Sequence, residues 1–268
     1  VLSRNVDAAL GIVSEVIRTP SFPQAEFDRE KQNLLANLQQ QNNNPNAVGA
    51  RVRSLLAFGR EHPYGRPSQG FPSTVESITR EDVARHWQER VKPDSSVLVF
   101  VGGLTLDEAT QLAEKHFGPW AGGAAPEIAI GPPQMAAAGK IYLVDRQDAA
   151  QTVVTQFLKA PAVGHADDDA LTLADSVYGG GGFGTRLNLN LREDKGYSYG
   201  AFSSLVQFTD GGIWYGGGGV QTDKTAEALK EFFNELNAIL RPVPADELAR
   251  FKNYTALSFP GEFETSSQ

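Results

Sequence analysis

The 268-residue chain carries 32 acidic and 24 basic side chains, for a formal net charge of −8. This acidic balance, without any Lys/Arg-rich run, argues against a nucleic-acid partner. No apolar run approaches the roughly 20 residues that a membrane span requires, so we expect a soluble protein of the bacterial periplasm or cytoplasm. The absence of cysteine excludes disulfides, thiolate metal sites and a cysteine nucleophile.

The first part of the chain is predicted to be mainly helical. Apolar residues at helical spacing indicate helices over 6–17, 23–38 and 47–58, with Pro20 ending the first. Capping-box patterns, Thr79 with Asp82 and Thr105 with Glu108, open two further helices, the second ending near residue 117. Between these two helices, the apolar run 97–101 predicts a short strand.

The second part mixes strands and helices and follows a proline-rich segment. Residues 119–139 contain four prolines among small residues, which is a linker composition, and we place a domain boundary there. Strands are expected at 140–145, 151–159, 197–207 and 212–220, and helices at 167–178, 185–194, 226–240 and from 244 onward. The helix at 226–240 carries a predicted apolar stripe of Ala226, Leu229, Phe233, Leu236 and Leu240.

Two segments of the chain resemble each other. Residues 23–31 (PQAEFDREK) and 244–252 (PADELARFK) share Pro, Glu, Arg and Lys at identical spacing, and each follows an amphipathic helix. This similarity predicts an internal duplication. Residues 1–118 are then the C-terminal half of a first copy, and residues 140–268 are a second copy truncated at its C-terminus.

The glycine-rich stretch from Tyr178 to Gly200 is the most distinctive part of the sequence. Four consecutive glycines and a fifth after Phe183 permit positive φ angles or a close approach of another group. A short helix and a strand follow, so a turn at Gly196 could bring Arg192 and Tyr199 together. The glycines formally match a nucleotide-binding pattern, but they follow a helix rather than a strand, which argues against such a site.

Three motifs in order resemble the pitrilysin/insulinase zinc peptidases, the M16 family, in its branch that includes the mitochondrial processing peptidases. They are the run 23–31, the run 62–67 (HPYGRP), and the glycine stretch with Leu-Arg-Glu-x-x-Gly-x-x-Tyr over 191–199. The resemblance covers nearly the whole chain. It implies an α+β fold of duplicated M16-type domains, each an antiparallel sheet faced by helices.

The resemblance also implies a zinc site, which this chain does not complete. The family binds zinc through an inverted His-x-x-Glu-His motif, absent here, and a downstream glutamate whose position falls on Asn37. A neutral amide is a poor zinc ligand, and the four histidines (His62, His86, His116 and His165) are scattered singly. We therefore expect no metal on this chain and zinc in a partner subunit.

In the family, an arginine and a tyrosine at the spacing of Arg192 and Tyr199 complete the active site. The resemblance thus implies a non-catalytic, substrate-binding chain that supplies both residues to the zinc site of a catalytic M16-type subunit, or to a homodimer, for peptide hydrolysis. One alternative is an active zinc metalloendopeptidase whose motif lies upstream of Val1, and another is a structural scaffold like a respiratory-complex core protein. From the residues alone, Arg192 also fits a helix-dipole partner, and Tyr199 fits a packing residue.

Overall fold

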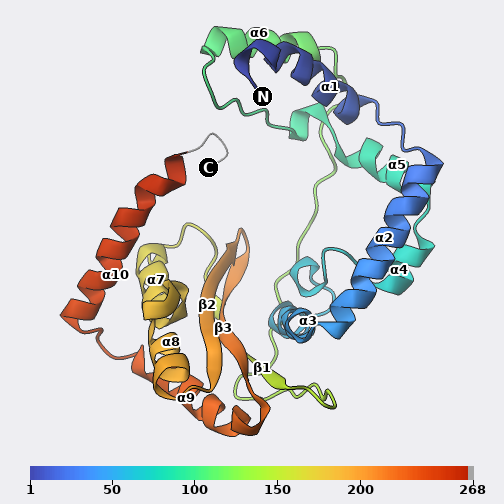
Figure 1. Cartoon of the computed structure of the whole chain (residues 1–268). Coiled ribbons are helices and arrows are strands. Elements are labelled where there is room, and N and C mark those ends of the chain that lie inside the picture. The colour runs from blue at the N-terminus through green and yellow to red at the C-terminus, as the bar shows by residue number, and fades with distance from the viewer. Residues whose placement is uncertain (265–268) are drawn as a thin grey trace. The chain divides into compact units, whose positions relative to one another are not determined.

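The computed structural model describes residues 1–264, and these form two compact units (Figure 1). The first comprises Val1–Gln39, Gln69–Ala129 and residues 261–264, and the second comprises Gln40–Ser68 and Ile130–Pro260. Residues 40–68 therefore pack with the segment that follows the proline-rich stretch. The predicted duplication, with its linker at 119–139, stays a prediction.

The first unit is built from helices. They are α1 (Val6–Arg18), most of α2 (Gln24–Asn43), α4 (Pro72–Ser77), α5 (Arg80–Arg90) and α6 (Leu106–Phe117). Both predicted capping boxes are present at the starts of α5 and α6. α1 is held to α6 by the Ser14 hydroxyl, which donates to the His116 carbonyl at 2.6 Å, and by an ion pair between Lys115 and Asp7 at 2.7 Å.

The second unit contains the sheet. Its helices are α3 (Pro45–Phe58), α7 (Asp168–Asp175), α8 (Arg186–Asn188), α9 (Thr225–Ala238) and α10 (Ala245–Ser258), and its strands are β1 (Gln151–Ala160), β2 (Ser198–Phe208) and β3 (Gly211–Gln221). The strand order is β1-β3-β2 and both pairings are antiparallel. An antiparallel sheet combined with many helices confirms the predicted α+β class.

Helices cover both faces of this sheet. Figure 1 shows α7 and α8 along one face and α3 along the other. On the α8 side the core includes side chains that are at most 1 % exposed, among them Tyr178, Leu187, Leu191, Val220 and Phe232. Leu187 and Leu191 both come from the helical run that the sequence predicts at 185–194. On the other side, Ala57 and Phe58 of α3 pack against Ile213 of β3.

Two predicted strands are not formed. Residues 97–101 and 140–145 run outside any sheet in the described structure, and their side chains are largely exposed; Val97 is 89 % exposed and Leu143 86 %. Apolar, β-branched composition gives a segment the preference for a strand, but the backbone N–H and C=O groups of a strand need a neighbouring strand to bond to. Among residues 1–264 neither segment has one.

Two helix predictions were also wrong in detail. The polar run after Leu38 does not end α2, which continues to Asn43. Leu229 and Leu236 of the predicted α9 stripe pack against the core. The buried ring of this helix is that of Phe232, 1 % exposed, whereas Phe233 is 49 % and Leu240 81 % exposed. Neighbouring phenylalanines lie about 100° apart around a helix, so a register error of one residue exchanges the buried and exposed rings. Among residues 1–264, none of the helices combines the length and apolar character of a bilayer crossing.

Candidate functional site

Tyr199 lies on an irregular part of strand β2. The pairing of β2 with β3 shifts register between Ser198 and Ala201, which leaves Tyr199 and Gly200 outside the regular ladder. The Ser198 hydroxyl stabilises this bulge: it lies 2.8 Å from the Gly200 carbonyl and 2.7 Å from that of Gly219, and it accepts the Gly200 N–H at 3.1 Å. Bulges re-aim side chains, and here the Tyr199 side chain is 82 % exposed.

Arg192 lies next to Tyr199, as the sequence predicts. It belongs to a π-helical turn, Leu189–Asp194, that continues α8, and Gly196, at a φ of 65°, follows that turn. The guanidinium carbon of Arg192 is 5.2 Å from the centre of the Tyr199 ring and 4.3 Å from that of Phe183. Both distances lie within the range of cation–π attraction. We call Phe183, Arg192 and Tyr199 the arginine–aromatic cluster.

The glycine loop that carries Phe183 is fixed to β2 by one buried side chain. Asn188 is 4 % exposed, and its amide nitrogen donates to the Gly182 carbonyl at 3.0 Å and to the Ala201 carbonyl at 2.7 Å. Its amide oxygen accepts the Ala201 N–H at 3.0 Å. The Thr185 hydroxyl also donates to the Gly182 carbonyl, at 3.0 Å. Asn188 therefore links the loop of Phe183 to the strand of Tyr199.

A largely buried ion pair holds the start of the same helical run. The Arg186 guanidinium donates from Nε at 2.9 Å and from Nη2 at 2.6 Å to the Glu247 carboxylate of α10. Both side chains are about 15 % exposed, and the Glu247 carboxylate raises the pKa of Arg186 above its ordinary value. Bidentate pairs of this kind fix geometry as well as charge. Arg186 therefore anchors the helical run to α10.

The glycines preceding Phe183 are needed for close packing. A Cβ on Gly179 would lie 2.6 Å from the Ser203 backbone nitrogen, and one on Gly181 would lie 2.6 Å from the Phe251 ring. Gly182 alone among the glycines of this stretch, residues 179–184, has a positive φ, of 81°. The glycine run therefore allows close packing against β2 and α10, and Gly182 provides the turn that leads to Phe183.

The structure gives no zinc-binding set to the described residues. Asn37, at the expected glutamate position, is exposed on α2, and among residues 1–264 no three His, Asp or Glu side chains gather as metal ligands. His62 stacks on Phe58 at 5.5 Å, and its Nδ1 accepts the Tyr64 N–H. His116 faces Asp7 at 2.7 Å. Among the described residues, Asn37 and the singly placed histidines do not form a set of donors that fits zinc.

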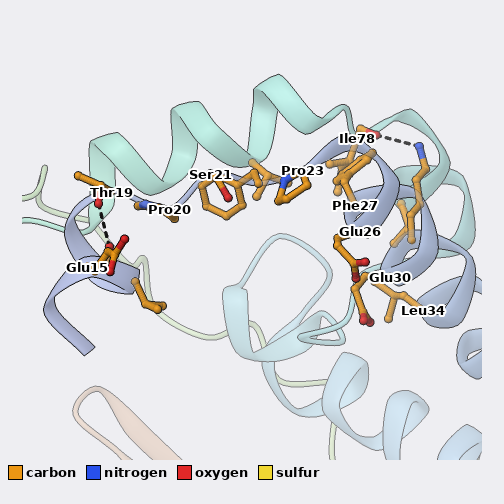
Figure 2. Close-up of a pocket in the computed structure, with 15 residues that line it drawn as sticks. Glu15, Thr19, Pro20, Ser21, Pro23, Glu26, Phe27, Glu30, Leu34 and Ile78 are labelled. Atoms are coloured by element: carbon orange, nitrogen blue, oxygen red, sulfur yellow. Dashed lines mark hydrogen bonds between the residues drawn. The ribbon is translucent and has the colours of Figure 1, made fainter. Parts of the chain in front are cut away.

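A hollow lies within the first unit (Figure 2). It has a volume of about 650 Å³ and is lined mainly by apolar side chains of α1, α2, α4 and α5, together with Glu15, Glu26 and Glu30. Arg29 pairs with Glu26 and Glu30, at 2.6 and 2.7 Å. Lys31, which also lines the hollow, donates to the carbonyls of Glu76 and Ile78 at 2.8 Å. Two of the three lining glutamates are thus paired with a cation of the protein itself.

Two residues around the cluster, Phe183 and Asn188, were not predicted from the sequence. Phe183 had one signal, because it is the single large apolar residue between five glycines. Asn188 had none, because its role depends on a contact with a strand 13 residues further along the chain.

Comparisons with known proteins agree on the family. The sequence pattern of the peptidase M16 inactive domain matches residues 77–254. An uncharacterized zinc protease of Mycobacterium tuberculosis is 27 % identical over 214 residues, 79 % of this chain and 48 % of the relative. The beta subunit of the mitochondrial-processing peptidase of Bos taurus is 26 % identical over 259 residues, 94 % of this chain and 52 % of that subunit. The chain thus spans about half the length of these relatives.

Solved structures share the fold. The crystal structure of a peptidase M16 inactive domain from Pseudomonas fluorescens superposes with a TM-score of 0.86 at 25 % identity, covering 95 % of this chain and 61 % of the other. A protease from Helicobacter pylori superposes with a TM-score of 0.86 at 24 % identity, covering 99 % and 64 %.

Proposed function

This chain belongs to the family of the peptidase M16 inactive domain, and from that premise we propose that it is the non-catalytic, substrate-binding chain of a heteromeric zinc peptidase. The observation that supports this most strongly is the juxtaposition of Arg192 with the exposed phenol of Tyr199. The two residues come from different elements, a helical turn and a strand bulge. A packing role for Tyr199 does not account for a side chain that is 82 % exposed.

The chemistry of the two side chains suits the binding of a peptide. A guanidinium presents several N–H donors in a rigid plane, and a phenol presents one O–H donor. Both donate hydrogen bonds to the carbonyl oxygens of a peptide backbone. When such a carbonyl is attacked, its oxygen becomes an oxyanion, to which charge-assisted hydrogen bonds are stronger than to the neutral carbonyl. Arg192 and Tyr199 therefore bind the substrate and stabilise the transition state.

The nucleophile is then supplied by a partner. Because Asn37 and the scattered histidines do not fit zinc, we assign zinc to a catalytic M16-type subunit or to the other half of a homodimer. Relatives of this chain carry the names zinc protease and mitochondrial-processing peptidase subunit beta. Donors such as Arg192 and Tyr199 bind the backbone carbonyls of a peptide, and these carbonyls are accessible when the peptide is extended. The substrate class that we propose is therefore peptides in an extended conformation.

A second candidate function is an active zinc peptidase in its own right. It is favoured by the name zinc protease of several relatives, of which this chain spans about half. Metal ligands would then lie on a part of the protein beyond these 268 residues. The zinc content of the purified full-length protein separates the two candidates: about one zinc per chain supports the second, and a metal-free chain supports the first.

Substitution of the two donors tests the proposed role. In the full-length protein assembled with its catalytic partner, we expect Arg192→Ala to lower kcat/KM for a peptide by about 100- to 1,000-fold, the usual loss for one oxyanion donor. Tyr199→Phe, which keeps the ring and removes the hydroxyl, should lower it by at least about tenfold. Unchanged turnover in both variants would contradict the proposal.

A further inference from the structure

The arginine–aromatic cluster contains one residue that the proposed function does not use. The Phe183 side chain is 66 % exposed. Its ring contacts the Arg192 guanidinium, whose carbon lies 4.3 Å from the ring centre. Hydrogen bonds on both sides of Phe183 hold the loop backbone that carries the ring.

Both residues flanking Phe183 have their carbonyls bound. The Gly182 carbonyl accepts from the Asn188 amide and from the Thr185 hydroxyl, each at 3.0 Å. The Gly184 carbonyl accepts from the Arg250 guanidinium of α10 at 3.4 Å. The positive φ of Gly182, 81°, sets the direction of the chain into Phe183. The loop backbone is therefore held on both sides of Phe183, which places the start of its side chain beside Arg192.

The Phe183 ring and the Tyr199 ring both contact the Arg192 guanidinium. The guanidinium carbon of Arg192 lies over the Phe183 ring at 4.3 Å and over the Tyr199 ring at 5.2 Å. A planar guanidinium that faces aromatic rings keeps its in-plane N–H groups directed away from those rings. Such N–H groups can bind a peptide carbonyl while the exposed parts of both rings remain open to the side chains next to that carbonyl.

We propose that Phe183 is a specificity-determining residue of this site, and that its ring, with that of Tyr199, receives a bulky apolar or aromatic side chain of the bound peptide. This inference rests on the proposed function, in which Arg192 binds the peptide backbone. Aromatic rings bind other apolar rings and chains through area burial and favourable ring geometry. The backbone contact is independent of sequence, so Phe183 supplies a preference that Arg192 does not.

Binding of two matched peptides tests this inference. The full-length protein is titrated against two fluorescein-labelled, unstructured dodecapeptides of Gly and Ser, one of which carries two Phe residues at central positions. We expect Phe183→Ala to raise the Kd of the Phe-containing peptide by about two- to tenfold, and that of the Gly/Ser peptide by less than about twofold. Phe183→Tyr should keep the wild-type preference. Phe233→Ala removes a ring of similar exposure on α9 and should change neither Kd.

The outcomes separate this inference from the proposed function. If Phe183→Ala weakens the binding of both peptides equally, the ring only positions Arg192. If it weakens the binding of neither, the ring contributes nothing to binding. Each result overturns the inference. Arg192→Ala should weaken both peptides, because it removes a backbone contact. If Arg192→Ala changes neither Kd, the proposed function fails, whatever Phe183→Ala does. Circular dichroism melting of each variant checks that the fold is intact.

Discussion

Arg186 and Arg192 lie six residues apart on one helical run and meet opposite surroundings. Arg186 makes a bidentate, largely buried ion pair with Glu247 of α10. Arg192 faces two exposed aromatic rings and its neighbour Glu193, whose carboxylate lies 3.4 Å from Nε. The same residue type thus anchors a helix at one end of the run and faces an exposed aromatic surface at the other.

Partner and burial decide the role of each arginine. A guanidinium in a bidentate pair with a carboxylate has few N–H donors left for a ligand. Its removal leaves the buried carboxylate without a compensating charge. A guanidinium held by ring faces keeps its donors for a ligand. We therefore expect substitutions at Arg186 to change stability, and substitutions at Arg192 to change activity.

The largest effect on stability is expected at Asn188, which lies between the two arginines. Asn188→Ala removes the amide that bonds Gly182 and both backbone groups of Ala201. The N–H and carbonyl of the buried Ala201 lose this partner, whereas the Gly182 carbonyl keeps the Thr185 hydroxyl. We expect a loss of about 2 to 4 kcal/mol in the free energy of unfolding, measured by urea denaturation. Asn234→Ala, an exposed asparagine on α9, is the control and should cost less than about 0.5 kcal/mol. A loss of that small size at Asn188 would show that the network does not fix the loop.

A smaller loss should follow substitution of the anchoring arginine. Arg186→Ala leaves the Glu247 carboxylate in a largely buried position, and we expect a loss of about 1 to 3 kcal/mol in the same denaturation experiment. The double variant with Glu247→Ala should cost less than the sum of the two single variants, because the pair acts as a unit. Arg192→Ala is the matched control, expected to change stability by less than about 0.5 kcal/mol. Equal losses at both arginines would remove the contrast between them.

The smallest effect concerns pH and the core beneath the glycine loop. Burial raises the pKa of Asp175 above its ordinary value of 3.8, although hydrogen bonds from Ser203 and Trp214 act in the opposite direction. The folded state therefore holds the proton of Asp175 more tightly than the unfolded state does. As pH rises from about 3.8 through the folded pKa, the contribution of Asp175 to the free energy of unfolding falls. Asp175→Asn should remove that loss. Tm measured between pH 3 and 6 should fall less with rising pH in the variant; parallel curves would contradict the assignment.

Sequence patterns correctly predicted the strands whose pairing partners also lie within the described chain. The strands at 151–159, 197–207 and 212–220 form as β1, β2 and β3, because each has a neighbour to bond. The apolar runs at 97–101 and 140–145 are also rich in residues that favour strands, yet they form none, because composition does not provide the neighbouring backbone. Local pattern therefore predicts a preference, and pairing depends on residues far away in sequence.

The candidate site was predictable to a similar extent. The turn at Gly196 was readable from spacing, and it brings Arg192 to Tyr199. The bulge at Ser198 and the crosslink by Asn188 were not, since both depend on hydrogen bonds between residues that share no sequence pattern. The ring of Phe183 joined the site only through the path of the loop that these contacts hold.

The central claim is that this chain supplies Arg192 and Tyr199 to a zinc site on another chain. The most direct measurement titrates a fixed amount of the purified catalytic partner with the full-length protein, as wild type or as the double variant Arg192→Ala, Tyr199→Phe, and follows peptide hydrolysis. We expect wild type to raise turnover in proportion to complex formed, and the double variant to leave it at the level of the partner alone while co-eluting with the partner in size-exclusion chromatography. Equal stimulation by the two proteins would contradict the claim.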